Sequence, residues 1–422
     1  MQTFNIANSF IEKNYNRYLY NDAILNLRYK NRRLPMRKIY CDNGATSYPK
    51  APQVGESMIN YINNIGCNVN RGAYSSSYKA ENAVYETREL LCELFDFDKP
   101  ENVIFTSNIT TSLNMVLKGL LSEGDNVIVS SMEHNAVMRP LSSLIRKGIT
   151  MTKIPCNNLG EIDVKNVESS ITEKTKAIVM THCSNVCGTL LPIDEIGQIC
   201  KNHNIIFIVD SAQTAGIIDI SMRKNNIDIL CFTGHKGLLG PQGIGGFLIR
   251  DEIVPLVDPL IEGGTGSLSE QEVQPIYMPD KYESGTANIP AIYGLNSSLK
   301  YLMEVGIKNI YEKEMYLTKV FIDAISDIDE ILLIGKKDME NRTSVVSLDF
   351  KNLDNGLVCH QLDKFYNIQT RSGLHCAPSA HKTLGTFPNG SVRFSFGHFN
   401  SVDDINYVIE SLKNIISSKS EI

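Results

Sequence analysis

Between about residues 100 and 250, short apolar runs alternate with longer stretches in which apolar residues recur every three or four positions. The runs predict strands at 103–106, 127–130, 177–181, 205–210, 229–233 and 246–249. The stretches between them, such as 113–121, have the period of helices. Apolar strands separated by helices are typical of a mostly parallel sheet covered on both faces. The sequence therefore predicts an α/β domain.

The pattern changes after residue 285. A helix is predicted near 292–305, strands near 345–350 and 392–396, and an amphipathic helix from about 402. We therefore expect a smaller α+β domain at 285–422 and a large domain at 36–284, whose first segment can join the smaller one. A chain of 422 residues is longer than one core usually supports, which also favours two domains.

Residues 1–35 form an N-terminal extension without sustained apolar periodicity, and their basic residues cluster at 28–33. We expect a mobile or docked arm here, and contact with a partner is the alternative interpretation. Met36 stands directly before the motifs described below, so it is a candidate alternative start of the protein.

Composition and charge exclude several classes of protein. A hydrophobic content of 42% with 21% charged residues is ordinary for a soluble globular protein. The formal net charge of −6 argues against a protein that binds nucleic acid or anionic membranes in bulk. No apolar run reaches the length of a membrane span, and the N-terminus lacks the apolar stretch of a secretory signal. We therefore expect a cytoplasmic protein.

The ten cysteines are spread along the chain without the paired spacing of a zinc site or a disulfide framework, so no metal site is predicted. Cys183 and Cys187 lie near His182, but we interpret them as structural. Most of the others lie in apolar runs, where reduced cysteine acts as a small core residue. Cys376 differs because it follows a turn with basic and glycine residues and comes two residues before a proline, which indicates a loop.

Lys236 and Asp210 suggest a cofactor. A lysine amine can hold an aldehyde as a Schiff base, and a carboxylate against a ring nitrogen keeps that ring protonated and electron-withdrawing. Asp210 ends an apolar strand, where an unpaired carboxylate is costly, so it needs a cationic partner such as a pyridinium nitrogen. Thr110 and Thr111 stand at a predicted helix start whose free amides can bind phosphate, although a plain helix cap explains them equally well. Together these residues predict pyridoxal 5′-phosphate.

Lysine, aspartate and cysteine in this setting resemble those of the cysteine desulfurases, within the class V aminotransferase family. The resemblance spans about residues 36–415, and its motifs include 42–47 (DNGATS), 133–136 (EHNA), 210–213 (DSAQ), 232–237 (FTGHKG), 263–267 (GGTGS), 283–288 (ESGTAN) and 371–376 (RSGLHC). It implies fold type I of the pyridoxal phosphate-dependent transferases, with a mostly parallel seven-stranded sheet in the large domain. It also implies a homodimer in which Thr286 reaches the phosphate of the other subunit.

The same resemblance implies roles for individual residues. His134 stacks on the cofactor ring and shares in catalysis with Lys236 and Cys376. The residues implied to bind the cofactor are Thr110, Thr111, His134, Asn185, Asp210, Gln213, Thr233, His235, Lys236 and Thr286. The residues implied to bind the substrate are Asn43, Ala45, Asn185, Arg371, His375 and Arg393. Arg393 lies in an apolar strand, where a structural salt bridge competes with a substrate carboxylate as the explanation.

Cys376 determines the expected reaction. In the resembling enzymes a cysteine at this position attacks the sulfur of bound L-cysteine, which leaves L-alanine and a persulfide that is passed to a thiol or an acceptor protein. We expect Arg371 and His375 to lower the pKa of Cys376 by favouring its thiolate. Leu374 stands where many relatives have a second histidine, so the acid/base chemistry of the persulfide stays open.

Other functions remain open at this point. One alternative is a selenocysteine lyase, which would use the same cofactor residues. Another is a class V aminotransferase in which Cys376 is not catalytic but an inert loop residue. A third is a protein that acts mainly in sulfur delivery or as a scaffold, with residues 28–33 as its docking element.

Overall fold

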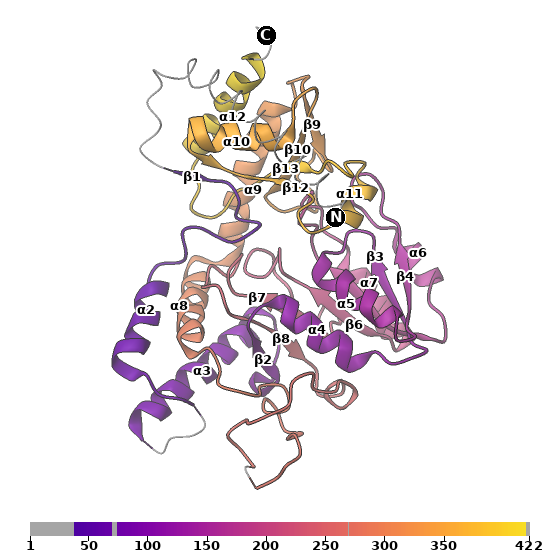
Figure 1. The fold of residues 1–422 in the computed structure, drawn as a ribbon, viewed down its shortest axis with the longest axis vertical. Helices are drawn as coiled ribbons and strands as arrows, with labels where there is room; N and C mark the ends of the chain where they lie inside the picture. Colours follow the sequence, from indigo (N-terminus) through magenta and orange to yellow (C-terminus); the bar gives the residue numbers. More distant parts are fainter. Residues whose placement is uncertain (1–37, 70–73, 269, 419–422) are drawn as a thin grey trace, which may run out of the picture.

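The computed structural model describes residues 38–69, 74–268 and 270–418 of the chain. The extension expected at 1–35, its basic cluster at 28–33 and Met36 lie outside the described residues. In Figure 1 the C-terminal part of the chain, coloured orange to yellow, occupies the upper part of the molecule above the central sheet.

The central sheet has seven strands. Their order is β2 (Val103–Thr106), β8 (Gly245–Ile249), β7 (Ile229–Thr233), β6 (Ile206–Asp210), β5 (Thr175–Thr181), β3 (Asn126–Ser130) and β4 (Thr150–Ile154). β8 is antiparallel to both of its neighbours, and the pairs from β7 to β4 are parallel. The predicted α/β fold with a mostly parallel seven-stranded sheet is confirmed, and so are the six strands that the apolar runs indicated, with ends that differ by two residues at most.

The seventh strand, β4, was not predicted from the hydrophobic pattern. It forms an edge of the sheet beside β3, and both Thr150 and Lys153 are exposed. An edge strand can carry polar residues because one side meets solvent. No continuous apolar run therefore marks β4 in the sequence.

Helices surround the sheet. Those between successive strands are α4 (Ile109–Leu120), α5 (Asn135–Ile145), α6 (Val164–Ser169) and α7 (Ile193–His203). α2 (Val54–Asn60), its continuation η1 (Tyr61–Ile65), α3 (Ser75–Leu94) and α8 (Ile289–Val305) pack together beside it (Figure 1). Two short 3-10 turns complete this part, η2 (Pro100–Asn102) and η3 (Val254–Leu256). Among the described residues, no helix is both long and apolar enough to cross a membrane.

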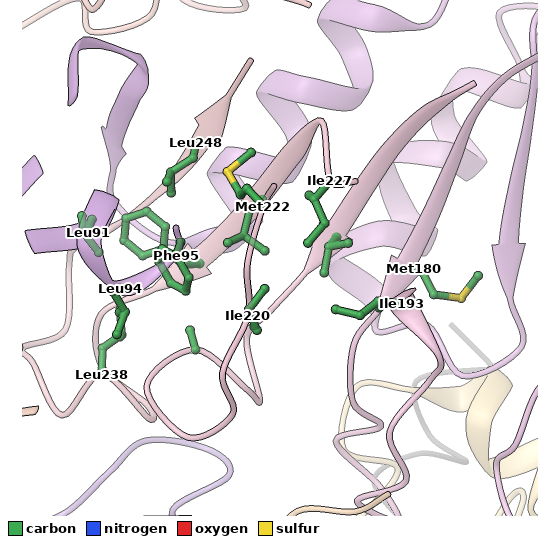
Figure 2. Close-up of a cluster of buried hydrophobic side chains, with 14 of the residues drawn as sticks. Leu91, Leu94, Phe95, Met180, Ile193, Ile220, Met222, Ile227, Leu238 and Leu248 are labelled. Atoms are coloured by element: carbon green, nitrogen blue, oxygen red, sulfur yellow. The ribbon is translucent and has the colours of Figure 1, made fainter. Parts of the chain in front are cut away.

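Apolar side chains cover both faces of the sheet, because successive strand residues point to opposite sides. In β3, Ile128 belongs to one buried cluster, whereas Val127 and Val129 belong to the other. Figure 2 shows part of the first cluster, including Leu91 and Phe95 at the end of α3. Burial on both faces explains why these strands read as continuous apolar runs.

The C-terminal part contains an antiparallel sheet in the order β12 (Arg371–Gly373), β13 (Ser391–Ser395), β10 (Val345–Phe350) and β9 (Ile331–Ile334). α9 (Ile307–Ile325), α10 (Asn355–Tyr366) and α12 (Val402–Ser417) share a third apolar cluster with this sheet, and α11 (Pro378–Thr383) precedes β13. β1 (Ile39–Tyr40) pairs with β11 (Ile368–Gln369), so the start of the described chain lies beside the C-terminal part. The domain boundary between 284 and 285 stays a prediction.

Candidate active site

Polar residues from several strands meet at one edge of the central sheet. Asp210 and Thr233 end β6 and β7, while His134 and Asn185 follow the ends of β3 and β5 by four residues. Parallel strands have their carboxyl ends at the same edge, which is where open α/β sheets bind their ligands. Lys236 follows three residues after Thr233.

Lys236 and Asp210 influence each other's ionisation. Burial lowers the pKa of Lys236 to about 8, the charge of Arg393 acts in the same direction, and the charge of Asp210 opposes both. Burial raises the pKa of Asp210, while a hydrogen bond of 2.9 Å from the backbone N–H of Ala212 favours its carboxylate. The described residues provide no salt-bridge partner for Asp210 within 4.0 Å. A buried carboxylate without a direct cationic partner fits the pyridinium nitrogen that the sequence predicted.

His134 caps the N-terminus of α5. Its Nδ1 accepts a hydrogen bond of 3.0 Å from the backbone N–H of Ala136. Burial, together with the charge of Lys236, lowers the pKa of His134 to about 4. The ring is therefore neutral at pH 7, and because Nδ1 is an acceptor, Nε2 carries the proton.

Glu133, directly before His134, is fully buried and was not recognised from the sequence. One carboxyl oxygen accepts a bond of 2.5 Å from Ser130 Oγ, and both oxygens lie 3.0 Å from the backbone nitrogen of Thr181 at the end of β5. Burial raises the pKa of Glu133 to about 8. A neutral carboxyl group therefore ties the loop of His134 to the neighbouring strand. A glutamate beside the candidate histidine, just after a strand, was the available signal.

The predicted phosphate site lies at the start of α4. Thr233 pairs with Gly245, and a Cβ on Gly245 would lie 2.9 Å from backbone atoms of Asn108, so the end of β7 is close to this helix start. Asn108 caps α4 by accepting from the backbone N–H of Thr111, and Thr110 is exposed. Thr111 thus has the plain capping contact that was the alternative to phosphate binding.

Two atoms near this helix start lack partners. Thr233 Oγ1 and His235 Nδ1 are buried, and no described residue forms a hydrogen bond with either. Unpaired buried polar atoms are costly unless a ligand satisfies them. With Asp210 and Lys236 nearby, these orphaned atoms fit a phosphorylated pyridine aldehyde.

The segment after β1 closes another side of the site. Gln213 Nε2 donates to the carbonyl oxygen of Gly44 at 3.0 Å, and the backbone N–H of Ser47 donates to the carbonyl oxygen of His235 at 2.9 Å. Asn43 and Lys236 both line the same pocket. The amide of Asn43 itself donates to the carbonyl oxygen of Ser395, so this side chain also joins the N-terminal segment to β13.

Arg393 is buried in β13 and has a protein carboxylate as its partner. Its Nη2 lies 2.6 Å from Asp42 Oδ1, and its Nη1 donates to the carbonyl oxygen of Asn185 at 3.1 Å. Its Nε is buried and has no described hydrogen-bond partner. The competing explanation from the sequence, a structural salt bridge, therefore describes part of what Arg393 does. Asp42 belongs to the DNGATS motif but was not recognised as its partner.

The loop after β12 holds Cys376 in place through its backbone. His375 and Cys376 both have positive φ angles, 47° and 58°, which are uncommon for residues with side chains. The carbonyl oxygen of His375 accepts from Asn185 Nδ2 at 2.7 Å, and that of Cys376 accepts from the backbone N–H of Asn135 at 2.8 Å. All ten cysteines lie in the described part of the chain, and Cys376 alone among them is exposed.

The two residues expected to favour a thiolate at Cys376 differ in their placement. Arg371 Nη2 lies 3.7 Å from Cys376 Sγ. His375 is buried with Nε2 3.3 Å from Ser391 Oγ, and burial with the charge of Arg393 lowers its pKa to about 2. The ring of His375 is therefore neutral, so it does not supply positive charge to Cys376, and its expected effect on the thiolate stays a prediction.

Two further residues predicted for the site are Ala45 and Thr286. Ala45 is half-buried, and its backbone N–H donates to the carbonyl oxygen of Asp42 at 3.0 Å. Thr286 is exposed, and among the described residues none forms a hydrogen bond with it. The roles assigned to the individual residues stay predictions.

Comparisons with known proteins agree on one family. Residues 39–408 match the model of the class-V aminotransferase family. A probable cysteine desulfurase of Methanothermobacter thermautotrophicus is 32% identical over 381 residues, which cover 89% of this chain and 94% of the relative. One of Pyrococcus abyssi is 31% identical over 392 residues, covering 91% and 96% of the two chains.

A solved structure is similar as well. The apo structure of a cysteine desulfurase from Thermococcus onnurineus has a TM-score of 0.84 with 30% identity, covering 90% of this chain and 95% of that one. Since both the sequence and the fold match over nearly the whole described chain, this protein belongs to the class-V aminotransferase family, where its relatives include proteins named as cysteine desulfurases.

Proposed function

We propose that this protein is a pyridoxal 5′-phosphate-dependent cysteine desulfurase, which converts L-cysteine to L-alanine and transfers the sulfur to Cys376 as a persulfide. The observation that carries the proposal is the position of Cys376. This exposed thiol is bound through its backbone to Asn135, next to His134, in the site that also contains Lys236 and Asp210. The names of the relatives support the same reaction.

The cofactor would be held by residues that lack partners in the protein. Thr233, His235 and the start of α4 would bind its phosphate, Asp210 its ring nitrogen, and Lys236 its aldehyde. When bound, the cofactor supplies a carbonyl group for the substrate amine and a ring that withdraws electrons from the substrate Cα. The neutral His134 would lie against this ring without adding charge to it.

Lys236 would carry the proton. Its pKa of about 8 leaves a substantial fraction of the amine neutral near pH 7 to 8, so it can accept the substrate Cα proton and later return it. A lysine with an ordinary pKa of 10.5 would be almost fully protonated at the same pH. Burial therefore prepares Lys236 for this task.

Cys376 would take the sulfur. Its thiolate attacks the sulfur of the bound cysteine, a sulfur–sulfur bond forms, and the carbon–sulfur bond breaks. The electron pair of the broken bond remains on the carbon side, which gains a proton and leaves as alanine. Arg371 Nη2 lies 3.7 Å from the sulfur atom of Cys376, beside the place where the substrate would react.

Arg393 would bind the substrate carboxylate in competition with Asp42. Its orphaned Nε and its position beside Asn185 leave one edge of the guanidinium for a second anion. We further propose a homodimer, in which the exposed Thr286 would reach the partner's phosphate site. All ten cysteines are free thiols, which suits a reducing compartment such as the cytoplasm.

Alanine formation from L-cysteine without a keto acid tests the proposal, with dithiothreitol as the thiol. We expect the wild type and Cys359→Ala to form alanine, because Cys359 is a half-buried thiol that donates towards Thr370. Cys376→Ala should lose the activity while it keeps the visible absorption of the bound cofactor. Full alanine formation by Cys376→Ala would contradict the assignment, and turnover of selenocysteine alone would make the protein a selenocysteine lyase.

A further inference from the structure

Two segments near Cys376 contain no acidic residue. Neither 134–160 nor 364–402 has an Asp or Glu, although the chain as a whole has 47 of them in 422 residues. The basic residues of these segments are Arg139, Arg146, Lys147, Lys153, Lys364, Arg371, Lys382 and Arg393. The protein has a net charge of −6, so these segments differ in sign from the molecule as a whole.

The fold places both segments around the thiol. The backbone N–H of Asn135 donates to the carbonyl oxygen of Cys376 at 2.8 Å. Lys153 Nζ, on the edge strand β4, donates to Ser379 Oγ at 3.2 Å, only three residues after Cys376. In Figure 1, α11 accordingly lies close to the end of the sheet formed by β3 and β4.

Three of the basic side chains are exposed here, and Arg371 is half-buried. Arg139 stands one turn after Asn135 on α5, so it lies on the same face of that helix. Lys153 contacts Ser379 of α11 from β4, and Lys382 belongs to α11 itself. None of these three forms an ion pair with a described residue. Their charges are therefore not neutralised by the part of the protein that the structure describes.

An exposed aromatic ring adjoins these charges. The Phe387 side chain is 46% exposed, and Lys382 Nζ lies 4.9 Å from the centre of its ring. Aromatic residues next to basic ones are typical anchors of protein–protein interfaces. A small thiol would not need such an anchor.

We propose that Arg139, Lys153, Lys382 and Phe387 form a docking surface for a sulfur acceptor protein that presents its thiol on an acidic face. The proposal rests on the proposed function, because it concerns the persulfide of Cys376. Opposite charges raise the encounter rate of two proteins and orient them. The basic surface would thus direct the acceptor thiol to Cys376 on a molecule that otherwise repels acidic partners.

The transfer itself needs no further reactant. The acceptor thiolate attacks the outer sulfur of the Cys376 persulfide, and a new sulfur–sulfur bond forms on the acceptor. The bond to Cys376 Sγ breaks, and its electron pair leaves Cys376 as a thiolate, which can begin another turnover.

Two short peptides serve as probes, each with one cysteine, flanked in one by glutamates and in the other by lysines. With a peptide as the only thiol added besides the substrate L-cysteine, the peptide-dependent increase in alanine formation by the holoenzyme gives kcat/KM for the peptide. We expect the glutamate peptide to be about tenfold better than the lysine peptide at low salt, and the difference to shrink as salt screens the charges. The Lys153→Glu/Lys382→Glu variant should reverse the preference.

A second variant controls for net charge. Lys174→Glu/Lys201→Glu changes the net charge by the same amount as Lys153→Glu/Lys382→Glu. Both residues are exposed, but Lys174 lies just before β5 and Lys201 near the end of α7, towards the edge of the sheet opposite the candidate active site. It should keep the wild-type preference. Equal use of both peptides by the wild type, or the same shift in both variants, would overturn the docking proposal.

The remaining outcomes separate this proposal from the proposed function. If one equivalent of enzyme forms no alanine from L-cysteine with any thiol, the proposed function fails. If alanine forms but peptide charge has no effect, only the docking surface fails. Binding of oligouridylate that is lost in Lys153→Glu/Lys382→Glu would assign the surface to RNA and also overturn the proposal.

Discussion

Arg393 and Asp42, which lie 351 residues apart in the chain, form a buried ion pair of 2.6 Å in the candidate active site. The Arg393 side chain is 1% exposed and that of Asp42 is 18% exposed. Removing one member of such a pair leaves a buried charge without compensation. The pair therefore joins the segment after β1 to β13, and it also orients the guanidinium group of Arg393.

We expect Asp42→Asn to lower the free energy of unfolding by about 3 kcal/mol, near the low end for buried pairs because Asp42 is partly exposed. Urea unfolding measures the change. Asp323→Asn is the matched control, since it breaks the exposed pair of Lys319 and Asp323 at 2.6 Å and should cost at most about 0.5 kcal/mol. Equal losses in both variants would contradict the structural role of the buried pair.

The buried carboxyl groups of Glu133 and Glu314 predict how stability depends on pH. Burial raises the pKa of each from 4.5 to about 8. Between these values the folded state binds more protons than the unfolded state, so the free energy of unfolding decreases as pH rises and levels off above about pH 8. Each carboxyl contributes at most about 1.4 kcal/mol per pH unit.

Glu133→Gln and Glu314→Gln test this dependence. Each variant should flatten the decrease between pH 7 and 8, where the buried histidines are already neutral, and urea unfolding at several pH values measures it. Glu168→Gln, which changes an exposed residue, should leave the slope as it is. A wild-type slope that both buried variants retain would show that these carboxyls are ionised in the folded protein.

The lowered pKa of Lys236 predicts how the apo-protein takes up its cofactor. Only a neutral amine condenses with an aldehyde, so the rate of binding pyridoxal 5′-phosphate should rise with pH and level off above about pH 8. The visible absorbance of the bound cofactor follows the reaction. A rate that continues to increase beyond pH 10 would mean that burial does not act on this lysine.

Asp210→Asn provides a second measurement of the same lysine. The charge of Asp210 raises the pKa of Lys236, so its removal should shift the midpoint of that rate profile to lower pH. The same variant should bind the cofactor more weakly, because the ring nitrogen loses its anionic partner. An unchanged midpoint would show that the charge of Asp210 does not affect the pKa of Lys236.

Cys376 should be the first cysteine to react with N-ethylmaleimide. It alone among the ten is exposed, Cys156 and Cys359 are half-buried, and the others are buried. Peptide mapping after limited alkylation should find Cys376 first and Cys231 only after unfolding, since burial raises the pKa of the Cys231 thiol. Early labelling of Cys231 would contradict its position in the core.

Much of the fold could be predicted from the sequence because strands buried on both faces must be apolar throughout. The residues 229–233 and 103–106 were recognised as strands with the ends that the structure has. β4 was not predicted as a strand, because an edge strand can keep polar residues and so shows no continuous apolar run. The chemistry of Lys236 and Asp210 could also be predicted, since a buried carboxylate after a strand requires a partner.

The contacts of the site depended on the tertiary structure. Sequence reasoning placed His375 beside Cys376 as a residue that favours its thiolate, and the fold turns the ring towards Ser391 and buries it, which makes it neutral. Asp42 and Glu133 were part of recognised motifs, but their partners are Arg393 and the strand end at Thr181, which come from other parts of the chain.

The sequence by itself thus determined the α/β architecture, the family and the residue types available for cofactor and sulfur chemistry, because local patterns of burial and motif spacing encode them. The tertiary structure decided which groups are charged, which are paired and which segments surround Cys376. Ionisation and pairing depend on burial and on neighbours that are distant in the chain, and the local sequence does not contain that information.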